Sequence, residues 1–406
     1  MNIIPYQLIR IAFLILALLS IPTTIYLLHR MRKKSEKWKR LHLIEIEAVF
    51  LIITLAIGLF AGVAYSGFPS SPQFVKTVGP GAGPHLPLLS SVHFFKNVNN
   101  FEKIDDISEN PTAIPPPISR NTSEHLTIDI VAKEVLSEII PGTTFNYWTF
   151  NDRVPAPFIR ARVGDTITIN LENHPSNIHT HSLDFHAVTG PGGGAEVLQV
   201  PPGETKTFTF KALNPGIYIY HCASMPSVAA HMTHGQYGLI LIEPEEGLPP
   251  VDKEFYIVQG ELYTMGSTGD KGLQAFDAQA MLDGNPTYIV FNGRVGGVQL
   301  EANVGDTIRM YVGNGGVNLI SSFHVIGEIF DTVYPEGSMK GALFHNVQTT
   351  LVPAGGATIV EFKLEEPGTY ILVDHALARV EKGAYGILNV QGEFNEEIYY
   401  PKPTEQ

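Results

Sequence analysis

Three short strings recur in this chain in the same order, one unchanged and two with one residue replaced, and they constrain its fold more than any other feature. The pairs are separated by 141, 152 and 148 residues: Val163-Gly164-Asp165-Thr166-Ile167 and residues 304–308, Pro215-Gly216-Ile217-Tyr218 and residues 367–370, and Gly235-Gln236-Tyr237-Gly238 and residues 383–386. Each pair is weak evidence alone, but the shared order and spacing indicate an internal duplication. Each copy spans about 125–150 residues, which suits a seven- to eight-stranded Greek-key sandwich.

The composition favours strands over helices in the duplicated part. The chain has 38 Gly and 29 Pro among 406 residues, and short runs of Val, Ile, Thr, Tyr and Phe lie between these turn signals. Such runs predict an all-β protein. We expect two tandem Greek-key β-sandwiches over residues 121–247 and 248–396. Residues 69–120 are rich in Pro, Gly and Ser, and we expect them to form a linker with little regular structure.

Two apolar runs open the chain, at about residues 8–28 and 41–67, and each is long enough to cross a bilayer as a helix. The loop between them carries seven basic residues and one acidic residue. The positive-inside rule puts this loop in the cytoplasm. We therefore expect residues 1–68 to form a two-helix anchor in a bacterial inner membrane, with the sandwiches in the periplasm. The alternative is a targeting segment.

Charge excludes one class of partner. Residues 1–68 carry eight Lys or Arg and three Asp or Glu, a net charge of +5, and the whole chain carries −13, so the remainder carries −13 − 5 = −18. An acidic domain pair of this kind is not expected to bind nucleic acid.

The only cysteine, Cys222, lies within a set of histidines and cannot form an intrachain disulfide. His221 directly precedes it, and His231 follows nine residues later. Three more histidines lie upstream, at His179, His181 and His186. One thiolate and two imidazoles with a weak fourth ligand form a blue-copper electron-transfer site.

The spacing of these residues favours two metal sites. His221 and Cys222 are neighbours, so on an extended strand their side chains face opposite ways. Cys222 can then join His181 and His231 in one site, while His186 and His221 begin a second. Three other histidines of the same region, His174, His179 and His234, are expected at the surface.

Four further strings carry a resemblance to a known family. These strings are residues 184–190 (DFHAVTG), 220–223 (YHCA), 238–244 (GLILIEP) and 373–375 (VDH). Over about residues 121–395 the chain resembles the copper-containing nitrite reductases, trimers whose subunits have two cupredoxin domains. The resemblance implies the reduction of nitrite to nitric oxide and water, with electrons passing from a type 1 to a type 2 copper through Cys222 and His221.

The resemblance also implies a role for each site residue. The type 1 copper takes His181, Cys222 and His231, and the type 2 copper takes His186 and His221. A neighbouring subunit of the homotrimer supplies His375 as the third type 2 ligand. Asp184 and His324 match residues that deliver protons, and Ile326 matches an apolar residue that restricts how nitrite sits on copper. The alternatives are a capping role for Asp184 and core positions for His324 and Ile326.

The chain departs from the family at the fourth type 1 ligand. The family has a methionine five residues after the second type 1 histidine, and this chain has Gln236 there. An amide oxygen is a harder donor than a thioether, so Gln236 is expected to favour Cu(II) and lower the potential. The alternative is that Gln236 is not a ligand.

The expected anchor is a second departure, and it suggests a membrane electron donor. Quinol, a cytochrome c or a cupredoxin are the candidates. His42, Glu45 and Glu47 lie near the start of the second apolar run. Ionisable groups are uncommon at such positions, and these could form a quinol or proton site or simply lie at headgroup level.

Two other functions are compatible with a blue-copper motif. A two-domain multicopper oxidase needs histidines on both sides of the cysteine, and here Ala223 follows Cys222. A membrane-tethered blue-copper electron carrier needs no second copper, so the presence of His186, His221 and His375 favours the reductase.

Overall fold

A computed structural model describes residues 98–224 and 227–399 of the protein. The apolar runs at 8–28 and 41–67, together with His42, Glu45 and Glu47, lie outside the described residues, as does the first part of the expected linker. Within the described ranges, none of the helices has the length and apolar character needed to cross a bilayer.

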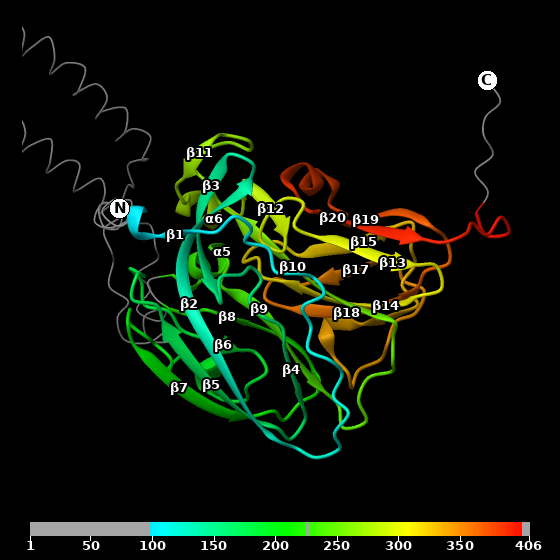
Figure 1. The fold of residues 1–406 in the computed structure, drawn as a ribbon, viewed down its shortest axis with the longest axis horizontal. Helices are drawn as coiled ribbons and strands as arrows, with labels where there is room; N and C mark the ends of the chain where they lie inside the picture. The colour runs from blue at the N-terminus through cyan, green and yellow to red at the C-terminus, as the bar shows by residue number, and fades with distance from the viewer. Residues whose placement is uncertain (1–97, 225–226, 400–406) are drawn as a thin grey trace, which may run out of the picture. The chain divides into compact units, whose positions relative to one another are not determined.

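The first half of the described chain forms a β-sandwich (Figure 1). One sheet has the strand order β11-β3-β2-β5-β7, in which β11 (Gly272–Gln274) comes from the second half and β1 also pairs with β2. The facing sheet has the order β4-β9-β8-β6. The strands of the first half are β1 (Glu102–Lys103), β2 (His125–Ile140), β3 (Thr143–Phe150), β4 (Ile159–Arg162), β5 (Thr166–Asn173), β6 (Asp184–Phe185), β7 (Thr205–Lys211), β8 (Gly216–His221) and β9 (Tyr237–Glu243). Cys222 lies in the apolar core between the two sheets.

The second half forms another sandwich, from sheets ordered β12-β10-β14-β18-β16 and β13-β20-β19-β15-β17. Its strands are β10 (Lys253–Leu262), β12 (Tyr288–Phe291), β13 (Gln299–Asn303), β14 (Thr307–Asn314), β15 (Ser321–Ile326), β16 (Thr332–Tyr334), β17 (Thr349–Val352), β18 (Ala357–Lys363), β19 (Gly368–Asp374) and β20 (Tyr385–Gln391). The prediction of an all-β fold with two sandwiches is confirmed for the described residues.

The repeated strings take the same place in both sandwiches. Gly164 and Gly305 each occupy a turn with positive φ (92° and 96°), where glycine avoids the clash of a side chain. The N–H of Gly164 donates to Ala212 (2.8 Å), and the N–H of Gly305 donates to Leu364 (2.8 Å). This shared geometry supports the internal duplication.

Strand β9 is buried on both of its faces. Ile240 and Ile242 belong to the core of the first sandwich. Leu239 and Leu241 point the other way, into a cluster that contains Tyr256 of β10. Figure 1 likewise shows β9 between the strands of the first sandwich and β10. This double burial explains why residues 238–242 are continuously apolar rather than alternating.

Segments outside the two sandwich cores also join the halves. The carbonyl of Pro111 accepts a hydrogen bond from Tyr256 of the second sandwich (2.8 Å), and that of Pro115 accepts one from Arg160 of the first (2.7 Å). In the other direction, β11 (Gly272–Gln274) of the second half pairs with β3 of the first. Part of the expected linker is therefore packed against both sandwiches.

Candidate metal centres

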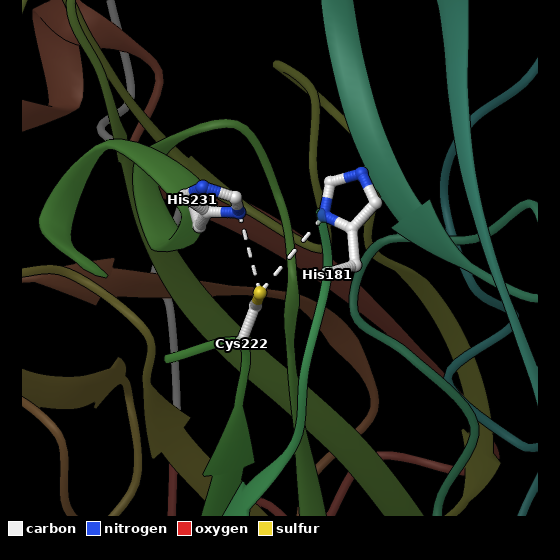
Figure 2. Close-up of side chains that lie close together, drawn as sticks. All are labelled: His181, Cys222 and His231. Atoms are coloured by element: carbon white, nitrogen blue, oxygen red, sulfur yellow. Dashed lines mark hydrogen bonds between the residues drawn. The ribbon is translucent and has the colours of Figure 1, made fainter. Parts of the chain in front are cut away.

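The first centre consists of three buried side chains whose ligand atoms converge at one point (Figure 2). Cys222 directly follows β8, and its Sγ lies 3.2 Å from Nδ1 of His231 and 3.9 Å from Nδ1 of His181. His231 lies on the short helix α5 (Val228–Thr233), whose N-cap Ser227 accepts a hydrogen bond from Ala230. The structure thus brings together the three residues predicted for the type 1 site.

The protonation states of these side chains suit a metal. Burial disfavours the Cys222 thiolate, but the neighbouring His181 and the backbone N–H groups of Ser182 and Ser224 outweigh this effect and lower the pKa of the thiol. Burial lowers the pKa of His231 to about 3, which keeps its imidazole neutral. A thiolate and neutral imidazoles are the forms in which these residues bind metals.

Gln236 lies beside this centre with its amide oxygen toward the imidazoles. Its Oε1 is 3.3 Å from Nδ1 of His231, and its buried Nε2 has no hydrogen-bond partner among the described residues. A buried amide nitrogen without a partner is costly. This position suits a Gln236 side chain whose amide oxygen Oε1 is bound by a metal in the centre.

Aromatic rings cover the first centre. Trp148 of β3 contacts His231 with ring centroids 4.6 Å apart and stacks on His234 at 4.1 Å. The expectation that His234 lies at the surface is wrong, because its ring packs between Trp148 and Phe145 and is 5% exposed. His174 and His179 are half-buried. No sequence pattern marks Trp148 as a neighbour of the ligands.

The second centre lies on the other side of the same peptide bond. Nε2 of His221 is 3.1 Å from Nε2 of His186, and Asp184 completes the group. Asp184 lies opposite His221 in the pairing of β6 with β8. The Nδ1 of His221 donates to the carbonyl of Cys222 (2.9 Å), so its Nε2 is the atom free to bind a metal. Burial and the neighbouring His221 lower the pKa of His186, which favours its neutral form.

A glycine loop makes room for the Asp184 carboxylate. The 3-10 helix η2 (Pro191–Gly194) includes Gly193, whose φ is 53°. A Cβ at Gly193 would lie far inside the van der Waals contact distance from the Asp184 Oδ1 atom. Glycine is therefore required at this position by both the backbone conformation and the space that the carboxylate occupies.

The remaining predicted residues form a separate cluster in the second sandwich. The rings of His324 and His375 lie 5.4 Å apart, and Nδ1 of His324 donates to the carbonyl of Gln348 (2.6 Å). Within the described part of the chain, neither histidine joins the ligand group of His186 and His221. Ile326 is 44% exposed, which excludes the core alternative in this chain.

Comparison with known proteins agrees with this arrangement. A family model described as multicopper oxidase matches residues 133–247. A copper-containing nitrite reductase of Neisseria meningitidis serogroup A is 52% identical over 305 residues, which are 74% of this chain and 78% of that protein. One from Pseudomonas chlororaphis is 31% identical over 63% of this chain and 76% of that protein. A solved structure of the copper nitrite reductase of Nitrosomonas europaea matches with a TM-score of 0.60 and 31% identity, covering 67% of this chain and 96% of that one. This chain, with its two His-rich groups on either side of one peptide bond, belongs to the copper-containing nitrite reductases.

Proposed function

We propose that this protein reduces nitrite to nitric oxide and water with two copper centres in each subunit. The proposal rests on one observation: two adjacent residues belong to different ligand groups. Cys222 faces His181 and His231, while His221 faces His186. A single peptide unit therefore joins the two groups covalently and offers one electron a short bonded path between two metals.

The first group would hold the type 1 copper through His181, Cys222, His231 and Gln236. Copper bound there supplies one-electron redox chemistry. The chain contributes a buried, preformed set of donors, in which the thiol is biased toward thiolate and His231 is neutral. An amide oxygen at the fourth position would lower the potential relative to a thioether.

The second group would hold the type 2 copper through His186 and His221, with His375 from a neighbouring subunit of a homotrimer. Exposed apolar side chains on the sheet whose strand β19 leads to His375 support this assembly. Ile326 and Ile371 are paired across β15 and β19 and are 44% and 36% exposed, and Leu351 on β17 is 62% exposed. Exposed apolar side chains in a group commonly mark a contact with another protein.

Two side chains are suited to deliver the protons. Reduction of one nitrite consumes one electron and two protons and releases one nitric oxide and one water. Asp184 presents a carboxylate oxygen beside His186 and His221, where it can hydrogen-bond the bound anion and pass on a proton. His324 commits its Nδ1 to Gln348, which leaves its Nε2 to exchange a proton across the subunit boundary. Ile326 would restrict the orientation of nitrite.

Anaerobic conversion of nitrite to nitric oxide by the copper-loaded protein tests this function. The parent should turn over, and His375→Ala should lose turnover and type 2 copper while it keeps the blue colour. His345→Ala, an exposed histidine of the same sandwich, is the matched control and should behave like the parent. A parent with two filled copper centres and no turnover would favour the electron carrier instead.

Mixed oligomers test whether the second centre is shared between subunits. A His186→Ala subunit still carries His375, and a His375→Ala subunit still carries His186 and His221. Co-assembly of the two inactive chains should therefore restore part of the activity, because some interfaces combine the intact halves. Activity that stays at zero in verified mixed trimers would contradict the shared site.

We also propose that residues 1–68 anchor the enzyme in a bacterial inner membrane, with the catalytic domains in the periplasm. The basic loop between two apolar runs supports this orientation. Quinol is the donor that this location favours, with a cytochrome c or a cupredoxin as alternatives. Nitrite-dependent quinol oxidation by the purified protein should disappear when residues 1–68 are removed, and equal quinol activity in the truncated protein would contradict the proposal.

A further inference from the structure

Glu134 of β2 is a buried carboxylate in contact with the first centre. Its side chain is fully buried, and Oε1 accepts hydrogen bonds from the backbone N–H groups of Ile178 and His179, each at 2.9 Å. The same oxygen lies 3.3 Å from Nε2 of His181 and 3.1 Å from Nδ1 of His179. The carboxylate thus touches an imidazole of the type 1 group on the side away from Cys222.

The two imidazoles of the first centre differ in their second nitrogen. His181 directs Nδ1 toward Cys222 and Nε2 toward Glu134. His231 also directs Nδ1 toward Cys222, but its buried Nε2 has no hydrogen-bond partner among the described residues. A carboxylate behind one metal-binding imidazole fixes its tautomer and makes it a stronger donor.

The second sandwich supplies an internal comparison for this carboxylate. Glu261 of β10 accepts hydrogen bonds from the backbone N–H groups of Asn318 (3.2 Å) and Leu319 (2.7 Å). The two glutamates hold equivalent positions in parallel strand pairs. Glu134 follows by two residues Ala132, which pairs with Asn173, and Glu261 follows by two residues Gln259, which pairs with Asn314. The contact with a loop backbone is therefore common to both copies.

The contact with an imidazole belongs to the first copy alone within the described chain. Glu261 accepts a hydrogen bond from the hydroxyl of Tyr263, whereas Glu134 lies against histidine rings. Oε1 of Glu134 also accepts hydrogen bonds from two backbone N–H groups, and such bonds favour the ionised form of a carboxyl group. The carboxylate therefore carries a full negative charge close to the centre.

We propose that Glu134 is a positioning residue of the type 1 centre, which fixes Nδ1 of His181 as the ligand atom and lowers the reduction potential. An anion beside a metal stabilises the oxidised ion, which has the higher positive charge, more than the reduced ion. This inference rests on the proposed function only through the identity of the metal. It assigns to a residue of β2 a part in the energetics of electron uptake.

Redox titration of the blue absorption band in Glu134→Gln tests the proposal, with Glu261→Gln as the matched control. The amide oxygen can still accept from Ile178 and His179, so the loop is retained while the charge is removed. We expect the equilibrium constant for reduction to rise about tenfold in Glu134→Gln, which corresponds to about 59 mV for one electron. Glu261→Gln should leave the potential unchanged.

A second variant separates charge from shape. Glu134→Asp keeps the negative charge and withdraws it from His181, so its potential should lie between those of the parent and Glu134→Gln. Copper affinity at the blue site should fall in the order parent, aspartate, glutamine. Parent-like potentials and blue spectra in either Glu134 variant would overturn the proposal and leave the glutamate as a loop cap.

The readout separates this inference from the proposed function. A blue parent protein that fails to turn over nitrite would overturn the proposed function, while the potentials of the variants would still decide the role of Glu134. A parent that takes up copper without forming a blue centre would overturn both.

Discussion

Asp374 occupies in the second sandwich the place that Cys222 occupies in the first. The N–H of Cys222 donates to Gln236, and that of Asp374 donates to Ala384. The N–H of Ser182 donates to Cys222 Sγ at 3.3 Å, and the equivalent N–H of Ser322 donates to Asp374 Oδ1 at 3.1 Å. The second copy therefore holds a buried carboxylate where the first holds a thiol.

Replacing Asp374 by asparagine should destabilise the second sandwich and loosen His375. Asp374 Oδ2 accepts from Arg379 (2.6 Å) and Gln259 (3.1 Å), and the amide would leave the guanidinium without its charged partner. We expect a loss of about 1–3 kcal/mol in the free energy of unfolding. Type 2 copper occupancy should fall while the blue band persists. Metal analysis with urea denaturation checks this, and full type 2 occupancy would contradict it.

Alanine at Gly193 should impair activity more than stability. The added Cβ would displace the Asp184 carboxylate, and positive φ costs an alanine about 1 kcal/mol. Gly203→Ala is the control, because Gly203 also has positive φ (81°) but has no atom within 4 Å of the added Cβ. Similar unfolding free energies with a lower kcat/KM for nitrite in Gly193→Ala alone are expected. Equal kinetics in the two variants would contradict the role of the loop.

Methionine at Gln236 should raise the potential of the type 1 centre. A thioether stabilises Cu(II) less than an amide oxygen does. The change also removes the buried Nε2 that has no partner among the described residues. Redox titration and the visible spectrum check this prediction. An unchanged spectrum and potential would show that Gln236 is not a ligand.

Glu328 should make stability fall as pH rises toward neutrality. Burial and the nearby Asp331 and Glu365 raise its pKa from 4.5 to about 7. Between these values the folded protein retains a proton that the unfolded chain has released, so folding loses stability as pH increases through this window. Glu328→Gln should therefore be about 1–2 kcal/mol more stable than the parent at pH 8, after allowance for partial exposure.

Urea denaturation at pH 5 and pH 8 measures this difference. The exposed Glu172 of β5 supplies the control variant, Glu172→Gln, which should follow the parent at both values. A Glu328→Gln protein with the same pH dependence as the parent would rule out this residue as the source.

Local patterns carried most of what the sequence could predict. Strand alternation separates His221 from Cys222 whatever the rest of the fold does, and repeated turn strings mark the two sandwiches. Glu134 could not be found this way, since it lies 47 positions from His181 and only the pairing of β2 with β5 brings the two together.

The burial of His234 depends on contacts that its own segment does not reveal. Its ring packs against Phe145 and Trp148 of β3 and against Phe276, which comes from the second half of the chain. A histidine beside a glycine and a polar residue looks like a surface residue in sequence. Its burial therefore needs both β3 of its own sandwich and a residue of the second half.

The double burial of β9 limits how this protein can be recombined with its relatives. Leu239 and Leu241 belong to the first sandwich by connectivity, but they pack in one cluster with Tyr256 of the second. In a chimera that joins two relatives in the short connection after β9, these leucines would pack against the β10 side chains of a different protein. The repeated strings indicate that the two sandwiches arose as copies, yet β9 and β10 must be exchanged as one unit.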